Sequence, residues 1–211
     1  MTDFEIKQQS GVDKIGSSIS VDSDFQDFRY FPKYLDNSSA DKLLETLLER
    51  TQWEREILKI YGKSISAPRL TSWFSDPMVS YRYSGRKRFG KPFTPELFQL
   101  RQILNARLNV HFNFVLANFY RDGKDYVGWH ADDEPDLGSR PLIASVSLGE
   151  SRRFRVRHNS RKVTESIDLV HGSLLIMRGK SQSHFKHCLA KTKRLVNSRI
   201  NLTFRTIQSI V

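Results

Sequence analysis

The residues Arg199-Ile200-Asn201-Leu202-Thr203-Phe204-Arg205 alternate between polar and apolar side chains without a break. A period of two is typical of a β-strand, so the polar side chains of this stretch share one face and the apolar ones the other. Similar short runs rich in β-formers precede it, and turn residues separate most of them. The sequence predicts strands over 111–121, 142–149, 152–158, 166–170, 173–178, 184–188 and 199–207.

The first half of the chain has helical periodicity instead. An apolar stripe of four leucines predicts a helix over 39–50. Thr94 is a good N-cap and Pro95 suits the first helical position, so a second helix is expected from there to Leu108. Helices followed by many short strands predict an α+β fold, in which N-terminal helices pack on one sheet of a jelly roll, or double-stranded β-helix.

The chain of 211 residues is long enough for one domain with an extension. Residues 1–27 are polar and lack periodicity, which predicts a loosely ordered N-terminal arm. Residues 28–110 contain the expected helices, and 111–211 the jelly-roll core. We expect 28–211 to form one domain.

Charge points to the class of partner. Lys and Arg number 34 against 23 acidic residues, giving a net charge of +11. Such an excess favours a polyanionic partner, nucleic acid before a membrane surface, although a basic surface without such a partner has the same composition.

The remaining composition bears on the compartment. The single cysteine, Cys188, excludes an internal disulfide framework and fits a reducing environment. No apolar run approaches the ~20 residues of a membrane-spanning helix, and the N-terminus lacks the pattern of a secretory signal. We expect a cytoplasmic monomer (nuclear in a eukaryote) without a membrane partner.

Metal-binding residue types occur in the segment Gly128-Trp129-His130-Ala131-Asp132. In extended structure His130 and Asp132 project to the same side, so both can reach one ion. Two histidines and one carboxylate are the ligand set of non-haem Fe(II) oxygenases, although a turn aspartate beside a surface histidine gives the same pair. The second histidine should come from a later strand, and the candidates are His158, His171, His184 and His187.

The polar face of the 199–205 strand suits a small dicarboxylate. Arg199 and Arg205 lie about 20 Å apart along a straight strand, and their long side chains can converge on a ligand between them. A polar face toward solvent is the alternative. Asn118 and Tyr120 interrupt an otherwise apolar run, and buried polar groups need partners, so they indicate a polar cavity.

Seven segments, in order, resemble the AlkB family of iron- and 2-oxoglutarate-dependent nucleic-acid demethylases. The resemblance runs from about residue 57 to 207. The segments are 68–71 (PRLT), 81–85 (YRYSG), 118–123 (NFYRDG), 130–135 (HADDEP), 143–149 (IASVSLG), 171–177 (HGSLLIM) and 199–205 (RINLTFR).

The resemblance implies an Fe(II) enzyme with 2-oxoglutarate and O2 as cosubstrates. It selects His187 as the second histidine ligand beside His130 and Asp132, leaves His184 facing away, and makes His171 structural. Arg199 and Arg205 would hold the carboxylates of 2-oxoglutarate, with hydrogen bonds from Asn118, Tyr120 and Asn201.

The implied reaction is oxidative demethylation of bases such as 1-methyladenine and 3-methylcytosine in DNA. It repairs the base directly and releases formaldehyde, succinate and CO2. A base inside a duplex must first be flipped out of the stack. Methylated RNA or single-stranded nucleic acid, a binding module without activity, and a protein hydroxylase are the rival interpretations.

The resemblance also places substrate contacts. It implies a nucleotide-recognition lid within residues 28–110, with Tyr81 and Tyr83 covering the flipped base. Arg69 would contact base or backbone. Asp133 and Glu134 would read a cationic methylated base, or form a solvated acidic turn. Tyr61 resembles the wedge that replaces a flipped base, or packs beside a hairpin glycine.

One predicted strand carries three outward cations, Arg153, Arg155 and Arg157. They suit phosphate contacts, whereas a solvated edge strand protected from aggregation is the alternative. Other cations expected on this surface are Arg86, Lys87, Arg88, Lys91, Arg161 and Lys162.

Overall fold

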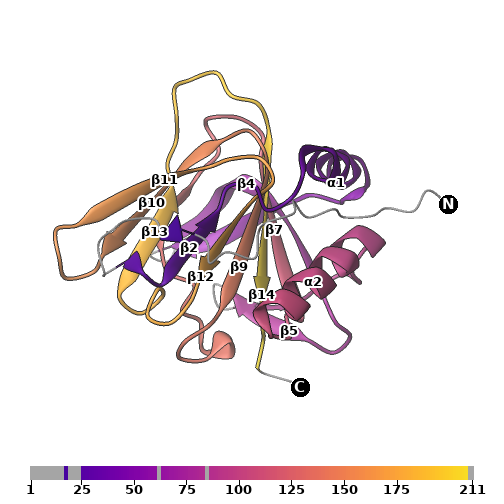
Figure 1. Cartoon of the computed structure of the whole chain (residues 1–211), viewed down its shortest axis with the longest axis horizontal. Coiled ribbons are helices and arrows are strands. Elements are labelled where there is room, and N and C mark those ends of the chain that lie inside the picture. Colours follow the sequence, from indigo (N-terminus) through magenta and orange to yellow (C-terminus); the bar gives the residue numbers. More distant parts are fainter. Residues whose placement is uncertain (1–16, 19–24, 61–62, 84–85, 209–211) are drawn as a thin grey trace.

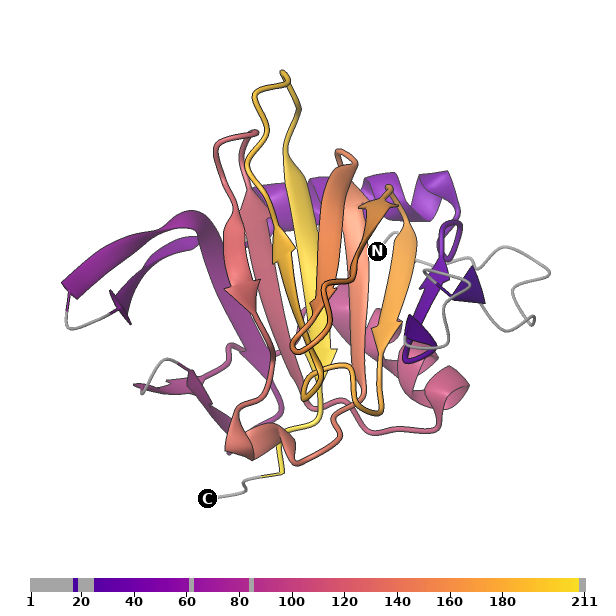
Figure 2. The same ribbon diagram turned by 90° about the vertical axis from the view of Figure 1, so that its left-hand side faces the viewer.

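Two antiparallel sheets face each other in the computed structural model, which describes residues 17–18, 25–60, 63–83 and 86–208 (Figures 1 and 2). The eight-stranded sheet has the order β1-β2-β12-β9-β14-β7-β4-β3, and the four-stranded sheet the order β11-β10-β13-β8. The larger sheet comprises β1 (Ser17–Ser18), β2 (Phe28–Phe31), β12 (Ser173–Met177), β9 (Ile143–Gly149), β14 (Arg199–Arg205), β7 (Phe114–Tyr120), β4 (Lys63–Ser75) and β3 (Glu54–Ile60). The smaller comprises β11 (Thr164–Leu169), β10 (Arg152–His158), β13 (Phe185–Leu189) and β8 (Val127–His130).

Two helices, α1 (Asn37–Arg50) and α2 (Pro95–Leu108), cover the outer face of the larger sheet (Figure 1). Thr94 caps α2 as predicted, since its hydroxyl accepts the Leu97 N–H at 3.3 Å. Helix α1 begins earlier than predicted because the Asp36 carboxylate caps it and accepts the Ser39 N–H at 2.9 Å. Apolar side chains of β14, β7 and β9 pack against the helices, so the polar side chains of the same strands face the other way.

A second apolar cluster lies between the two sheets. Phe154 and Val156 of β10 meet Leu175 and Met177 of β12 there, together with Ile143 of β9. This arrangement confirms the predicted α+β fold with a jelly-roll core. No helix in the described part of the chain is long and apolar enough to cross a membrane.

In addition to the expected helices, residues 28–110 contain strands of the larger sheet that the sequence did not predict. Three of its strands, β2, β3 and β4, join the larger sheet, so residue 110 marks no break between sheet and helices. The sequence pattern did not predict β4, because Pro68 interrupts it and proline is uncommon in the interior of a strand. A separate hairpin pairs β5 (Ser80–Tyr83) with β6 (Arg86–Phe89), and in Figure 2 it projects on the same side as the β3–β4 hairpin.

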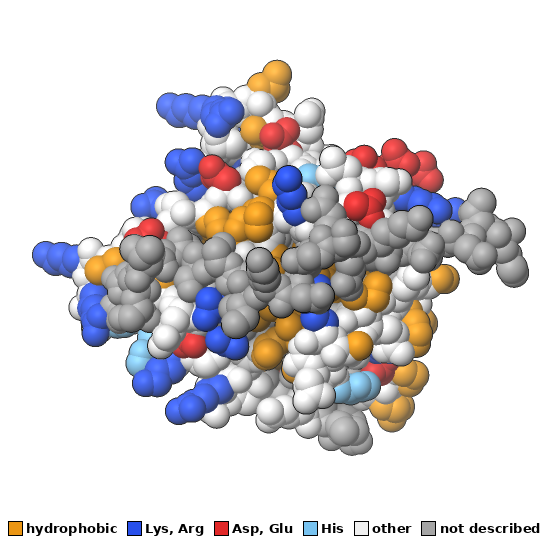
Figure 3. Space-filling view, viewed as in Figure 1, with side chains coloured by type: hydrophobic (Ala, Val, Ile, Leu, Met, Phe, Trp, Pro, Cys, Tyr) orange, Lys and Arg blue, Asp and Glu red, His pale blue; other side chains and the backbone are white. Residues whose placement is uncertain are grey.

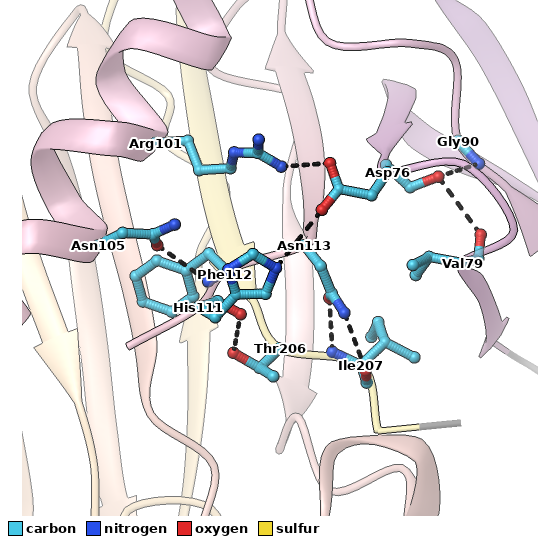
Figure 4. A network of polar contacts seen from close by, with 11 residues as sticks. Asp76, Val79, Gly90, Arg101, Asn105, His111, Phe112, Asn113, Thr206 and Ile207 are labelled. Atoms are coloured by element: carbon cyan, nitrogen blue, oxygen red, sulfur yellow. Dashed lines mark hydrogen bonds and ion pairs between the residues drawn. The ribbon is translucent and has the colours of Figure 1, made fainter. Parts of the chain in front are cut away.

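A polar network anchors the end of β14 (Figure 4). The Asn113 side chain accepts the Ile207 N–H at 2.8 Å and donates to the Ile207 carbonyl at 3.0 Å. The Asn113 N–H donates to the Arg205 carbonyl at 3.1 Å. Beside it, Arg101 of α2 binds Asp76, which also lies 3.7 Å from His111. The network fixes the backbone from which Arg205 projects into the space between the sheets.

Candidate metal and cosubstrate site

Strands β8 and β13 bring the expected ligands together. His130 on β8 and His187 on β13 are paired in the antiparallel register. Asp132 follows β8 by two residues, and one ligand atom from each of His130, Asp132 and His187 lies within 4.8 Å of the others. The structure therefore gathers His130 and Asp132 with His187, the histidine that the resemblance selected, whereas the other candidate histidines lie elsewhere.

The orientation of His130 is fixed by its own strand. Its Nδ1 lies 2.8 Å from the Gly128 carbonyl oxygen. A carbonyl can only accept, so Nδ1 carries the proton and Nε2 holds the lone pair. Nε2 is the atom that faces Asp132, at 3.9 Å from Oδ1. A hydrogen bond of this kind is the usual support of a metal-binding histidine.

His187 is buried against aromatic rings. Its ring centroid lies 5.2 Å from that of Phe154 and 4.3 Å from that of His130. Burial, with the nearby His130, lowers the pKa of His187 to about 3, which keeps the ring in the neutral form that binds metals. Its Nδ1 has no hydrogen-bond partner among the residues that the structure describes.

Asp132 is held from two sides. Its N–H donates to Gln182 Oε1 at 2.9 Å, and its Oδ2 accepts from Arg205 Nη2 at 2.9 Å. Burial by itself raises the pKa of Asp132, but the positive charge and hydrogen bond of Arg205, with the two neighbouring imidazoles, outweigh it and lower the pKa to about 2. Two neutral imidazoles beside an ionised carboxylate fit an Fe(II) ion with open positions.

The polar face of β14 forms the opposite wall of the cavity. Asn201 donates to Ser145 Oγ at 2.8 Å and to the Val146 carbonyl at 3.1 Å, and it accepts from Thr203 Oγ1 at 3.0 Å. Its side chain is thus held in place by β9 and β14. Polar residues lining the cavity are Arg69, Asn118, Tyr120, His130, Asp132, Ser145, His187, Arg199, Asn201, Thr203 and Arg205.

Arg199 is a buried cation, 2% exposed. Its Nη2 donates to Ser147 Oγ at 2.9 Å, and its guanidinium carbon lies 5.2 Å from the Tyr120 ring centroid. No carboxylate of the described residues pairs with it, and burial lowers its pKa to about 10. Burying a cation without an anion is costly. The surroundings of Arg199 therefore fit a ligand carboxylate such as that of 2-oxoglutarate.

Arg69 lies deeper than a nucleotide contact at the surface would. It is 4% exposed on β4, and its Nε donates to Asn118 Oδ1 at 2.6 Å. Because both side chains line the same cavity as His130, Arg69 adds positive charge close to the triad. Its predicted contact with base or backbone stays a prediction.

The structure describes the other expected substrate residues only in part. Asp133 is exposed and Glu134 is half-buried, in the segment that leads from Asp132 into a short 3-10 helix, Pro135–Leu137. Tyr81 and Tyr83 lie on β5, but their side chains are outside the described part of the structure. Tyr61 also lies outside the described residues, in the sequence between the end of β3 at Ile60 and the start of β4 at Lys63.

His184 and His171 lie apart from the three expected ligands. His184 is exposed, just before β13. His171 accepts the Gly149 N–H on Nδ1 at 2.8 Å, and its Nε2 lies 3.2 Å from Asp41. Sequence reasoning missed Gln182, which orients Asp132 from a turn and belongs to no pattern that would reveal it.

A jelly roll that holds two histidines and a carboxylate beside a buried arginine has the architecture of a non-haem Fe(II) oxygenase. Comparison with known proteins agrees. A family model for the 2OG-Fe(II) oxygenase superfamily matches residues 27–205. The solved structure of OsALKBH1 covers 85% of this chain and 97% of its own, with a TM-score of 0.63 at 17% identity, which bears on the fold alone.

Curated relatives narrow the family. The chain is 36% identical over 187 residues to the alpha-ketoglutarate-dependent dioxygenase alkB homolog 3 of Mus musculus, covering 84% of this chain and 65% of that protein. It is 36% identical over 181 residues to the DNA oxidative demethylase ALKBH2 of Homo sapiens, covering 81% and 69%. The match thus spans just under two thirds of the first relative's length. The chain belongs to the 2OG-Fe(II) oxygenase superfamily and, within it, to the AlkB family.

Proposed function

We propose that this protein is an Fe(II)- and 2-oxoglutarate-dependent dioxygenase that removes N-linked methyl groups from bases in DNA. The observation that carries the proposal is the buried Arg199 guanidinium, which has no carboxylate partner among the described residues and shares a cavity with the triad. That cavity contains both a metal-ligand set and a group that binds anions. A cosubstrate that contacts the metal and also carries a free carboxylate requires both.

In this proposal His130, Asp132 and His187 hold the iron. Arg199 binds one carboxylate of 2-oxoglutarate, while Asn118, Tyr120 and Asn201 line its position. Arg205 keeps Asp132 ionised and placed, because it binds the carboxylate oxygen directly. The bound iron supplies the activation of O2 and the oxidation of the methyl group.

The reaction balances with one O2. One oxygen atom enters succinate as 2-oxoglutarate loses CO2, and the other hydroxylates the N-methyl carbon. The resulting N–CH2OH group then loses formaldehyde: the electron pair of the C–N bond stays on the base nitrogen, and the hydroxyl proton leaves to solvent. No side chain of the protein has to act as a nucleophile in these steps. Cys188 suits this view, since it is buried and burial raises its pKa.

Three features support nucleic acid as the substrate. The net charge is +11. Lys and Arg side chains crowd the side of Figure 3 over β10, β11 and β13, while acidic ones gather near α1. Four relatives are named as DNA oxidative demethylases. The proposal assigns base and strand contacts to Tyr81, Tyr83, Asp133, Glu134, Arg69 and Tyr61, and phosphate contacts to the outer face of β10.

The test is formaldehyde release from oligonucleotides that carry 1-methyladenine or 3-methylcytosine, with Fe(II), 2-oxoglutarate and O2. DNA and RNA of one sequence, each single-stranded and duplex, form the arms. We expect formaldehyde from DNA, and none from Asp132→Ala. Release from RNA alone would replace DNA by RNA as the substrate. Absence of release from every arm, with iron and 2-oxoglutarate bound, would overturn the proposal.

A further inference from the structure

The outer face of the smaller sheet carries a stacked group of cations. On β10, Phe154 and Val156 are buried between the sheets, so Arg153, Arg155 and Arg157 point outward and are exposed. Trp129 on β8 lies between Gly128 and the cavity residue His130, and it is half-buried. The guanidinium carbons of Arg155 and Arg157 lie 5.6 and 4.4 Å from the centroid of the Trp129 ring. Two arginines therefore reach across β13 to one indole.

Strand β13 provides independent support for this arrangement. It lies between β10 and β8, and its buried His187 faces the cavity, so Lys186 and Cys188 point to the outer face. Lys186 is exposed, as expected, but Cys188 is only 4% exposed. Arg155 is the register partner of Cys188. The thiol is thus covered by the group formed by Trp129, Arg155 and Arg157, which we call the tryptophan–arginine cluster.

Arg153 differs from Arg155 and Arg157 because it has an acidic partner. Arg153 makes a paired contact with Asp168 of β11, with its Nε and Nη2 each 2.9 Å from a carboxylate oxygen. The β11 residues opposite Arg155 and Arg157 are Ser166 and Thr164, which carry no charge. Among the described residues no carboxylate pairs with Arg155 or Arg157. Their positive charges are therefore available to an anion, and that of Arg153 is already balanced.

Stacking on an indole suits these arginines to phosphate. A guanidinium that lies over a ring keeps its N–H groups in its own plane, where they reach phosphate oxygens in pairs. The stacking also limits side-chain freedom before the anion arrives. Trp129 directly precedes the cavity residue His130 on the edge strand β8, so these cations lie on the outer side of the strands that bound the cavity.

We propose that the tryptophan–arginine cluster is a phosphate-binding site for the backbone of the nucleic-acid substrate, in which Trp129 positions the guanidinium groups of Arg155 and Arg157. The inference rests on the proposed function, since it takes nucleic acid as the substrate. Trp129 is a positioning residue here, and Arg153 is excluded from the site by Asp168.

Salt-dependent binding of unmethylated oligonucleotides tests the site apart from the chemistry. DNA and RNA of the same sequence are titrated against the full chain by fluorescence anisotropy at several salt concentrations. Arg155→Gln and Arg157→Gln should each lower the slope of log Kd against log salt by about 0.7 for single strands or about 0.9 for duplex. The matched control, Arg153→Gln with Asp168→Asn, leaves the net charge unchanged and should leave the slope unchanged.

Trp129→Leu tests whether the indole ring positions the guanidinium groups of Arg155 and Arg157. It keeps both arginines but removes the ring, and we expect affinity to fall about two- to fivefold, whereas Trp129→Phe retains most of it. The same change should make Cys188, the only thiol of the chain, react faster with an alkylating reagent, since its cover is lost. Iron bound per chain checks that the neighbouring His130 still works in each variant.

The outcomes are distinct. Equal slopes for the control and for Arg157→Gln would overturn the site, and so would unchanged affinity in Trp129→Leu with a reactive Cys188. An unreactive Cys188 in that variant would contradict the claim that the Trp129 ring shields the thiol from solvent. Formaldehyde release with no effect of any cluster variant on binding would sink this inference alone. Cluster-dependent binding without release on any methylated substrate would sink the proposed function and leave the site standing.

Discussion

Arg205 Nη2 lies 2.9 Å from Asp132 Oδ2, so the last residue of β14 binds the carboxylate of the metal triad. Both side chains are buried, Arg205 at 2% exposed and Asp132 at 3%. The resemblance assigned Arg205 to a carboxylate of 2-oxoglutarate together with Arg199. The structure places the two arginines differently, since Arg205 touches a metal ligand and Arg199 does not, and the contact of Arg205 with 2-oxoglutarate stays a prediction.

Arg205→Gln should therefore weaken metal binding. Burial raises the pKa of Asp132, and the charge of Arg205 is the first influence that lowers it to about 2. Without that charge the pKa rises, protons compete with the metal at higher pH, and metal binding is lost earlier as pH falls. Metal affinity measured by calorimetry between neutral and acidic pH checks this. A variant with the wild-type affinity and pH dependence would refute the role of Arg205.

Arg199→Met should keep metal binding, unlike Arg205→Gln, and should lose the binding of 2-oxoglutarate. It removes a buried cation that lacks a carboxylate partner among the described residues, so the ligand-free protein should become about 1–3 kcal/mol more stable. Metal affinity should be unchanged, because Arg199 does not contact the triad, but 2-oxoglutarate should no longer raise the melting temperature. Thermal unfolding with and without 2-oxoglutarate gives both results. A destabilised variant that 2-oxoglutarate still protects would contradict this account.

Asn113→Leu should disturb the site from a distance. The change leaves the buried N–H and carbonyl of Ile207 without their side-chain partner, at a cost of about 2 kcal/mol in the free energy of unfolding. Because Ile207 lies two residues beyond Arg205 on the same backbone, loss of its anchor should also displace the Arg205 side chain and lower metal affinity. Thr206→Val removes a bond to the His111 carbonyl at the exposed side and should cost under about 0.5 kcal/mol. Urea unfolding compares the two, and equal losses would speak against the network.

The Asp36 cap should contribute a pH-dependent stability to α1. Asp36→Ala should lose about 1 kcal/mol at neutral pH, whereas Asp36→Asn, which keeps an accepting oxygen, should lose little. The Ser39 N–H is the first influence that lowers the pKa of Asp36. The charge therefore stabilises the fold above the unfolded-state pKa of about 3.9, and this contribution is lost as pH falls through the lower folded value. Unfolding curves at neutral and acidic pH test it, and an Ala variant as stable as wild type would exclude the cap.

The sequence predicted the strands that matter for the site because their alternation is strict. Residues 199–205 show the period of two over their whole length, and β14 covers these residues, two fewer than the predicted strand over 199–207. The strand predicted over 152–158 also coincides with β10. Helix α2 could be placed from Thr94 and Pro95, since capping is a local property.

What the sequence could not supply depends on contacts between distant segments. The pairing of His187 with His130 comes from strand register, and the residues alone left four histidines open until the family resemblance selected one. The partners Arg205–Asp132 and Gln182–Asp132 join positions 73 and 50 residues apart, and no local pattern encodes them. The bidentate pair of Arg153 with Asp168 likewise distinguishes three arginines that look alike in the sequence.

The central claim is tested most directly by product stoichiometry in a single reaction. Protein loaded with Fe(II) and 2-oxoglutarate without oxygen is mixed with O2 and a DNA oligonucleotide carrying one 1-methyladenine. We predict equal amounts of succinate, formaldehyde and unmethylated oligonucleotide, all absent with Asp132→Ala. Succinate formed while neither methylated DNA nor the matching RNA loses its methyl group would contradict the assignment.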